Sequence, residues 1–405
     1  MGGDDVTHST GSLAAGKVKK PHKDFPLFAH RTNRWCKKIK GQFHYFGKVS
    51  DDTNGERALA LWLEQKDDLL AGRKPSKDDA GKLTTRELVN KFLDEKERLR
   101  ASSEITPRTF SEYHATCERV IEAFGRLTPV SSLQAEDFGK LRASLATTRG
   151  PVALSNEITR VRMIFKFGFD NGLISAAPRY GQSFAKPKKK VFDKAKAERG
   201  ELGFAAGEIR ALLKASKDDV PLHAMILLGI NCAYGQADIS ALPTAAVDLD
   251  AGWATFPRPK TGVPRRAKLW GETVAAIREY LAQRPRPADP ADADCLFLNI
   301  RGRRFVRAIE GDDPSKWTRT DIIGAQFNRL LRERGMEGGR GFYGLRHSHQ
   351  LAAEMSMDLP AVMHVMGHTD QSISARYRGG TIPDVRLELV SQAVHAWLFA
   401  EGGAK

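Results

Sequence analysis

Residues 186–199 most constrain what this chain can fold into, because they form a run of charged residues with no apolar periodicity. A segment of this composition offers no continuous apolar face to a hydrophobic core. We therefore interpret residues 186–200 as a basic linker between separately folded parts. The length of 405 residues agrees with this division, since it suggests two or three domains. A solvated tether and a segment that follows a DNA backbone explain the linker equally well.

The part before residue 82 is predicted to hold a tail and a small domain. Residues 1–20 are rich in Gly, Ser, Thr and Asp and lack the apolar core of a secretory signal, so we expect a disordered, uncleaved tail. The aromatic and basic stretch 25–46 favours two or three short strands, and the apolar residues of 56–64 recur at helical spacing. We expect a small sheet capped by one helix over residues 21–75. It either presents a basic, aromatic face to DNA or buries its aromatic residues as a small adaptor.

Residues 82–185 carry helical patterns. Thr84-Thr-Arg-Glu87 resembles a capping box, and apolar stripes run through several segments, including 131–145 and 158–169. Four or five helices in about 100 residues predict an all-α domain.

The largest part, residues 201–400, is predicted to be an α-rich mixed domain. It opens with a helix over 206–215 and a strongly apolar helix near 222–232. A hairpin follows, with strands at 253–256 and 265–270 and a turn at 260–264. The apolar helix 385–399 packs either on its own domain or on a neighbouring protomer. The whole chain is therefore predicted to be multidomain and mainly α, with a small sheet at the N-terminus and a small hairpin or sheet in the last domain.

Composition limits the classes of function. The net charge is +15 and the pI is near 9.6, which favours polyanionic partners but is weak support by itself. The longest apolar stretch, 220–230, is too short to span a membrane and contains His223. The four cysteines lie far apart without metal-ligand spacing, so we expect reduced thiols in a cytoplasm and no metal site.

One ordered set of residues carries chemistry. Gly344-Leu-Arg346-His-Ser348, Met366-Gly-His368 and Tyr377 follow one another within 34 positions. This set resembles the tyrosine recombinase (phage integrase) family, whose signature is a His-x-x-Arg box, a later Gly-His and a nucleophilic tyrosine nine residues after that histidine. The predicted hairpin also carries Lys260 where the family places a catalytic lysine. By architecture, the resemblance extends to a small arm-type DNA-binding domain and a helical, SAM-like core-binding domain ahead of a catalytic domain.

The resemblance implies that duplex DNA is cut and rejoined through a 3′-phosphotyrosyl intermediate. Tyr377 would attack the phosphodiester, which retains the bond energy and needs no cofactor. Arg346 would clamp phosphate oxygens, His368 would donate a hydrogen bond, and Lys260 would protonate the leaving 5′ oxygen. Tyr343 stands where the family has the histidine of the box, and its phenol can donate a hydrogen bond.

The sequence departs from the family at its first arginine. The family's Gly-x-Arg-x-x-Glu stretch corresponds here to residues 235–240, where Gly235 matches but Ala237 and Ser240 replace the arginine and the glutamate. Loss of one donor to a developing oxyanion lowers a rate by roughly 10²–10³. Another cation therefore fills the gap, or catalysis is weak. The candidates are Arg265, Arg266 and Arg340.

Basic side chains in every part are candidate DNA contacts, and double-stranded DNA is the expected partner, bound by a homotetramer that assembles from monomers. The candidates are Arg31, Arg34, Lys37, Lys38, Lys40, Arg108, Arg160, Arg162, Lys188, Lys189, Lys190, Arg265 and Arg266.

Three functions remain open. The first is an integrase or transposon recombinase of a mobile element, acting in the cytoplasm at the nucleoid. The second is a catalytically degenerate DNA-binding protein descended from such an enzyme. The third, supported by charge alone, is an RNA-binding or structural protein.

Overall fold

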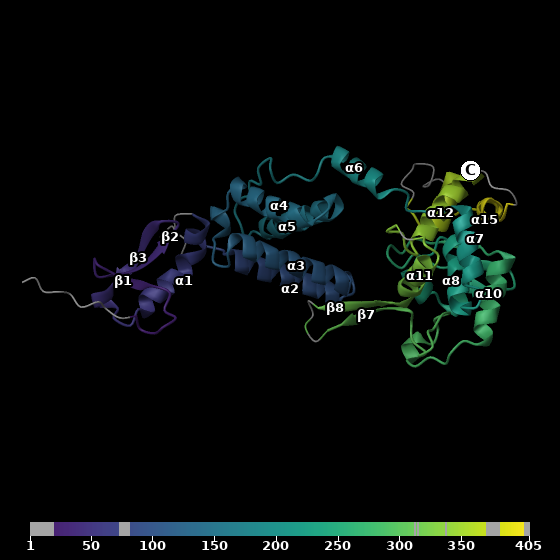
Figure 1. Cartoon of the computed structure of the whole chain (residues 1–405), viewed down its shortest axis with the longest axis horizontal. Coiled ribbons are helices and arrows are strands. Elements are labelled where there is room, and N and C mark those ends of the chain that lie inside the picture. Colours follow the sequence, from purple (N-terminus) through teal and green to yellow (C-terminus); the bar gives the residue numbers. More distant parts are fainter. Residues whose placement is uncertain are drawn as a thin grey trace, which may run out of the picture. The chain divides into compact units, whose positions relative to one another are not determined.

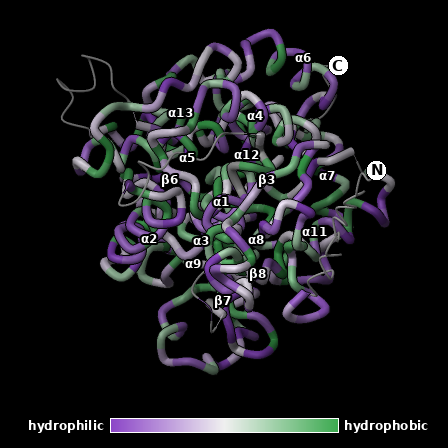
Figure 2. Tube along the Cα trace, turned by 90° about the vertical axis from the view of Figure 1, so that its left-hand side faces the viewer, coloured by the Kyte–Doolittle hydropathy of each residue, from purple (hydrophilic) through white to green (hydrophobic). Residues whose placement is uncertain are grey.

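The computed structural model describes residues 20–72, 82–311, 313, 316–336, 338–369 and 381–400. The chain divides into two compact units, residues 1–192 and 193–405, which are built mainly from helices and carry three small sheets (Figure 1). Apolar and polar residues alternate along these elements, as the hydropathy colouring of the trace shows (Figure 2). The protein is therefore multidomain and mainly α, as predicted. Among the described helices, none is both long and apolar enough to cross a bilayer.

The first unit begins with a three-stranded antiparallel sheet in the order β1-β2-β3, formed by β1 (Phe28–His30), β2 (Arg34–Ile39) and β3 (Gln42–Lys48). Lys40 and Gly41 form the β2–β3 turn, both with positive φ, as a two-residue hairpin requires. A short 3-10 turn (Val49–Asp51) leads to α1 (Glu56–Ala71), which packs on the sheet through Trp62 against Phe46. The predicted small sheet with one covering helix is confirmed, and the helix continues well past residue 64.

Four long helices follow: α2 (Thr85–Ala101), α3 (Pro107–Phe124), α4 (Ala135–Thr148) and α5 (Pro151–Asp170). The predicted capping box is present, since Thr84 Oγ1 accepts from Glu87 N at 3.2 Å and Glu87 Oε2 accepts from Thr84 N at 2.8 Å. The helix expected from residue 131 begins instead at Ala135. The chain at 130–132 forms a 3-10 turn, and Asp137 caps the backbone N–H of Gln134 at 2.9 Å.

The charged segment predicted as a linker is a helix, α6 (Lys189–Arg199). Its Lys and Ala residues favour helix formation, and Lys194 lies 3.7 Å from Glu198 one turn later. None of its side chains is buried. The boundary between the two units falls inside this helix. The composition thus correctly indicated that the segment adds nothing to a core. It did not indicate that the backbone of the segment is a regular helix.

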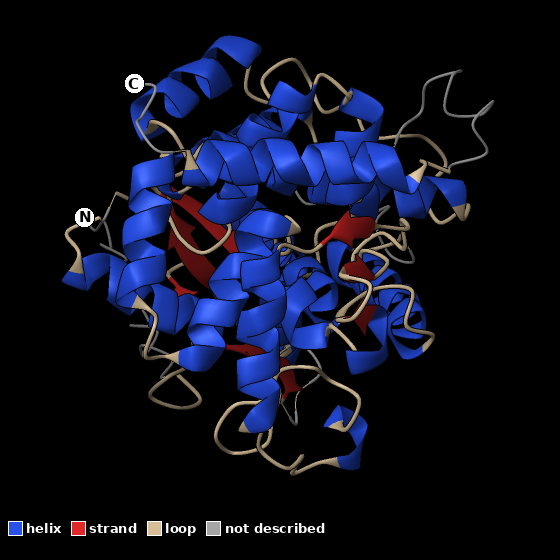
Figure 3. Ribbon diagram, turned by 90° about the vertical axis from the view of Figure 1, so that its right-hand side faces the viewer, coloured by secondary structure: helices blue, strands red, loops and turns tan. Residues whose placement is uncertain are grey.

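In the second unit, helices enclose short strands (Figure 3). The antiparallel sheet β4-β5-β6 contains the predicted hairpin, and β7 and β8 form a separate two-stranded ribbon. The elements are α7 (Ala206–Ala215), α8 (Val220–Asn231), α9 (Gln236–Ala241), β4 (Val247–Asp248), β5 (Trp253–Thr255), β6 (Arg266–Lys268), α10 (Gly271–Ala282), β7 (Val306–Glu310), β8 (Trp317–Asp321), α11 (Ile322–Glu333), α12 (Gly344–Ala353), α13 (Leu359–Met366) and α15 (Asp384–Phe399).

Helix α8 is the centre of this unit, because residues 224–231 are buried all round. At its end the buried Asn231 ties three elements together. Its Nδ2 donates to Lys268 O at 2.9 Å, and its Oδ1 accepts from Trp270 N and Thr273 Oγ1, each at 3.0 Å. These bonds fix strand β6 and the start of α10 against the C-terminal end of α8.

Helix α15 packs on its own unit, which decides between the two alternatives for the C-terminal helix. Leu387, Val390, Val394 and Leu398 are fully buried, and the helix contacts α7, α8, α12 and β6. Ser391 O also accepts a hydrogen bond from Trp270 Nε1 at 3.1 Å.

Candidate active site

The second unit holds Arg346 in a buried position on α12, with only 2% of the residue exposed. Its Nη1 donates to Ala233 O at 2.8 Å, and its Nη2 donates to Met366 O at 2.5 Å. The same Nη2 lies 3.0 Å from His368 Nε2. The guanidinium is therefore anchored to the ends of α8 and α13, and its orientation is fixed before any ligand arrives.

This contact sets the protonation state of His368. A guanidinium has no lone pair, so His368 Nε2 must be the acceptor, and the ring is neutral with its proton on Nδ1. Burial, together with the nearby charges of Arg346 and Arg258, lowers the pKa of His368 and keeps the ring neutral.

Two residues with positive φ bring the acceptors of Arg346 into place. Ala233, just after α8, has φ 57, a conformation that costs a non-glycine residue about 1 kcal/mol or more. Gly367, which ends α13, has φ 62. The backbone at these two points turns the carbonyl groups of Ala233 and Met366 toward the guanidinium.

The position expected to carry the first family arginine holds a short, exposed side chain, Ala237, on α9. The next residue, Asp238, does not face the site unpaired. Its Oδ2 accepts from Gly235 N and from Arg265 Nη1, both at 3.1 Å.

Arg265, the residue before β6, carries the guanidinium that pairs with this carboxylate. Its side chain is 0% exposed, its Nε donates to Phe256 O at 3.0 Å, and its Cζ lies 4.4 Å from the ring centroid of Tyr234. Its Nη2 is buried and has no hydrogen-bond partner among the described residues. An unpaired buried donor costs about 1–3 kcal/mol, and more when it is charged.

The other two candidates for the missing cation lie elsewhere. Arg266 forms a two-pronged pair with Asp384 at 2.8 and 2.9 Å and covers Trp253. Arg340 forms a two-pronged pair with Glu208 at 2.9 and 2.8 Å. Of the three arginines named from the sequence, Arg265 alone lies beside the altered motif.

Tyr343 lies against both motif segments. Its ring is 5.9 Å from Arg346 Cζ, and a Cβ added at Gly235 would lie 3.3 Å from Tyr343 Cδ2. The residue is 43% exposed. The structure thus brings together Arg346, His368 and Tyr343, which the sequence predicted as a group.

The hairpin between β5 and β6 contributes two further cations. Its turn is closed by the hydrogen bond from Arg258 N to Val263 O at 2.8 Å, and Lys260 is exposed at its tip. Arg258, which the sequence reasoning missed, packs against α13, since its Cβ lies 3.2 Å from where a Cβ at Gly367 would stand. The predicted hairpin could have identified Arg258 from the sequence. Arg258 lies opposite Val263 across the turn, and the chain leads from Val263 to Arg265.

Tyr377, the predicted nucleophile, lies outside the described residues.

Comparison with known proteins agrees with this arrangement. The profile of the phage integrase family matches residues 204–381, which contain Lys260, Arg346, His368 and Tyr377. The second unit therefore carries a domain that matches the tyrosine recombinase (phage integrase) family. A curated relative, tyrosine recombinase XerC of Alcanivorax borkumensis, is 23% identical over 303 residues, covering 74% of this chain and 91% of that protein. The putative defective protein IntQ of Escherichia coli is 24% identical over 224 residues, covering 49% of this chain and 52% of that protein.

Solved recombinase structures share the fold. A Tn1549 transposon integrase in complex with a circular intermediate DNA has a TM-score of 0.55 at 14% identity, covering 73% of this chain and 95% of that chain. A lambda integrase tetramer bound to a Holliday junction gives 0.52 at 15% identity, covering 86% of this chain and 96% of that one.

In this chain the basic residues predicted to contact DNA fall into two groups. Lys38 and Arg34 are exposed on the N-terminal sheet beside the exposed rings of Phe43 and Tyr45, with Lys38 Nζ 5.4 Å from the Phe43 centroid. Also exposed are Arg31, Lys40, Lys188, Lys189 and Lys190.

The second group of basic side chains already forms hydrogen bonds or ion pairs within this protein. Lys37 Nζ donates to Pro26 O at 2.9 Å, and Arg108 pairs with Glu112 at 2.9 Å. Arg160 pairs with Glu112 and with the buried Glu157, and Arg162 donates to Phe184 O at 2.8 Å. Internal ion pairs and hydrogen bonds, rather than free positive charge, are the observed roles of these side chains.

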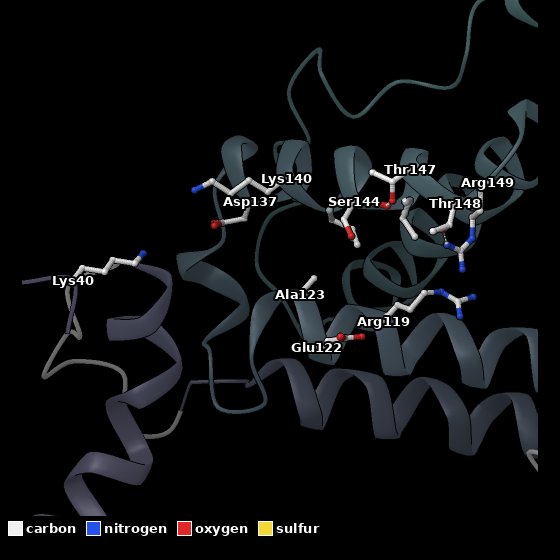
Figure 4. Close-up of a pocket in the computed structure, with 12 residues that line it drawn as sticks. Lys40, Arg119, Glu122, Ala123, Asp137, Lys140, Ser144, Thr147, Thr148 and Arg149 are labelled. Atoms are coloured by element: carbon white, nitrogen blue, oxygen red, sulfur yellow. Dashed lines mark hydrogen bonds between the residues drawn. The ribbon is translucent and has the colours of Figure 1, made fainter. Parts of the chain in front are cut away.

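A pocket of about 560 Å³ lies in the first unit, apart from the recombinase motifs (Figure 4). Its walls mix cations with carboxylates, so it has no uniform charge for an anionic ligand. The charged and polar residues that line it are Lys40, Arg119, Glu122, Asp137, Lys140, Ser144, Thr147, Thr148 and Arg149.

Proposed function

We propose that this chain is a site-specific DNA recombinase that cleaves and rejoins duplex DNA through a 3′-phosphotyrosyl intermediate. The observation that carries the proposal is the fixed Arg346, whose guanidinium is held by Ala233 O and Met366 O and contacts a neutral His368. These contacts use three of its five N–H groups. The remaining two are the groups that can meet phosphate oxygens in a fixed direction.

The proposed reaction assigns one role to each side chain. The Tyr377 oxygen attacks phosphorus, the bond to the 5′ oxygen breaks, and the phenol proton passes to water. Lys260, at the exposed tip of the hairpin, gives a proton to the departing 5′ oxygen. His368 donates from Nδ1 to a phosphate oxygen, and Tyr343 donates from its phenol. The reverse attack by a 5′ hydroxyl rejoins the strand without a nucleotide cofactor.

The remaining parts of the chain have proposed roles in binding. Residues 21–75 form an arm-type DNA-binding domain, residues 82–185 a core-binding domain, and residues 201–400 the catalytic domain. We also propose that monomers assemble into a homotetramer on DNA, within the nucleoid of a cell that carries the mobile element. The lambda integrase tetramer on a Holliday junction and the Tn1549 integrase on circular intermediate DNA support these points.

The test is formation of a covalent adduct. Duplexes that the protein selects from a randomised pool are nicked at successive positions, so that a cleaved strand end diffuses away and traps the protein. We expect an adduct that keeps the strand segment ending in the 3′ phosphate, so that a label at the 5′ end of the cut strand stays with the protein and a label at its 3′ end is released.

Two tyrosine variants provide the control. Tyr343 is a second exposed phenol close to Arg346, so Y343F is the matched control for Y377F. We expect Y377F to abolish the adduct and Y343F still to form it, more slowly than wild type because its donor to the phosphate is lost. An adduct that survives in Y377F and disappears in Y343F would show that Tyr343 is the nucleophile and would refute the role proposed for Tyr377.

A second candidate function is favoured by Ala237. In this alternative, the methyl group where the family has an arginine leaves the chain able to bind DNA but not to cut it. Salt-dependent binding of the selected duplexes without an adduct at any nick position would establish this alternative.

A further inference from the structure

We propose that Arg265 supplies the second guanidinium of the phosphate site, in place of the arginine that Ala237 has replaced. This inference rests on the proposed function, because it names a catalytic residue for that reaction. It is carried by four observations about the second unit.

The first observation concerns charge. Asp238 follows the vacant position, and an unpaired carboxylate there would repel a phosphate. Arg265 Nη1 lies 3.1 Å from Asp238 Oδ2 and cancels this charge. The same oxygen accepts from Gly235 N, so the ion pair also holds the N-terminal residue of α9. An arginine from the hairpin thus lies beside the segment in which Ala237 replaces the family's arginine.

The second observation concerns the donors of Arg265. The guanidinium spends its Nε on Phe256 O and one Nη1 hydrogen on Asp238, but its Nη2 has no partner among the described residues although it is fully buried. The adjacent Tyr234 Oη is also buried without a partner there. Buried donors are almost always paired in folded proteins. A phosphate oxygen is a fitting acceptor, because it is anionic and matches the geometry of the guanidinium.

The third observation places Arg265 next to Arg346. Arg346 donates to Ala233 O, and the next residue, Tyr234, carries the ring beneath Arg265 at 4.4 Å. Arg346 also donates to Met366 O, and the next residue, Gly367, lies against the Arg265 side chain. Both arginines are therefore held by the same two short segments.

The fourth observation is the space left by Gly367. A Cβ at this position would lie 2.5 Å from Arg265 Cδ and 2.7 Å from Cγ. The glycine of the Gly-His motif thus allows the Arg265 stem to pass directly beside residue 367, which precedes His368. In the free protein the Nη2 is covered, so a phosphate oxygen reaches it when the covering side chains move aside.

The experiment compares four proteins of full length: wild type, R265A, R265A/D238N and R278A. The double variant removes the carboxylate that R265A leaves unpaired, which guards against loss of folding. R278A is the control, since Arg278 lies in the same unit and pairs with the exposed Asp250 at 2.6 Å. Adduct rate on the nicked duplex, duplex Kd by fluorescence anisotropy and Tm are measured for each.

We expect R265A and R265A/D238N to form the adduct roughly 10²–10³ times more slowly than wild type. Their duplex Kd should change by less than about tenfold, because Arg265 would make one phosphate contact among the many that hold a duplex. R278A should keep the wild-type rate within about threefold. A folded R265A/D238N with the wild-type rate would overturn the role of Arg265 and leave the recombinase function intact. A wild-type protein that forms no adduct would instead overturn the proposed function itself.

Discussion

Gly367→Ala is the perturbation whose cost the structure defines most closely. Residue 367 has φ 62, and its added Cβ would meet Arg265 Cδ at 2.5 Å and Arg258 Cβ at 3.2 Å. The left-handed conformation costs a residue with a Cβ about 1–2 kcal/mol. Forcing one more carbon into a packed site costs about 1–3 kcal/mol. We therefore expect G367A to lower the free energy of unfolding of the second unit by about 2–5 kcal/mol.

Gly262→Ala is the matched control for the backbone term. Gly262 has φ 68, and no described atom lies within 4 Å of its added Cβ. G262A should therefore cost only the conformational share of about 1–2 kcal/mol. The difference between the two variants measures the contact of residue 367 with the arginines.

The double variant G367A/R265A distinguishes the contact of residue 367 with Arg265 from its contact with Arg258. Removal of the Arg265 stem takes away the closest atoms, so the cost of G367A should shrink by about 1–3 kcal/mol in that background. Urea unfolding of the full-length protein, followed by hydrogen exchange of α8 peptides, reports the second unit alone. Equal costs for G367A and G262A, or strictly additive costs in the cycle, would refute the packing of Arg265 against residue 367.

Three further measurements test other parts of the chain. Burial lowers the pKa of His349 from 6.5 to about 4, so the unfolded chain binds a proton that the folded chain refuses as the pH falls through this range. Through this residue the second unit should lose about 2 kcal/mol of its free energy of unfolding between pH 7 and pH 5. H349Q, measured at the same two pH values, should lack that loss. A free energy of unfolding that falls equally with pH in H349Q and in wild type would contradict the role of His349. K38A should reduce the slope of the logarithm of the DNA-binding constant against the logarithm of the salt concentration by about the share of one phosphate contact, as measured by fluorescence anisotropy. R162A should keep this slope and lower Tm, as measured by calorimetry. E157A should lower the free energy of unfolding by about 1–3 kcal/mol, since Glu157 is buried and pairs with the partly buried Arg119 and Arg160. E136A, at an exposed pair with Lys140, should leave the urea midpoint unchanged, and similar midpoints for the two variants would contradict the assignment.

Local patterns predicted most of the secondary structure. The capping box at Thr84, the helix at 206–215 and the hairpin after residue 253 depend on neighbours within a few positions, and the structure contains all three. Local patterns were less informative in two places. Residues 189–199, predicted as a linker because they lack an apolar face, form a helix with no buried residue. Phe169, which was assigned to an apolar stripe, is 44% exposed, so that assignment was wrong.

The sequence also indicated which motif residues belong together, because the order and spacing of Arg346, His368 and Tyr377 are features of the chain itself. It left three arginines as equal candidates for the missing cation. Arg265 lies 27 positions from its partner Asp238 and joins it only because β6 is fixed beside α9 and the end of α8. A contact between segments so distant in the sequence depends on how the helices and the sheet pack, and no short-range pattern of residue types encodes it. Spacing along the chain thus determined the family motif, whereas three-dimensional packing decided which guanidinium faces the altered position.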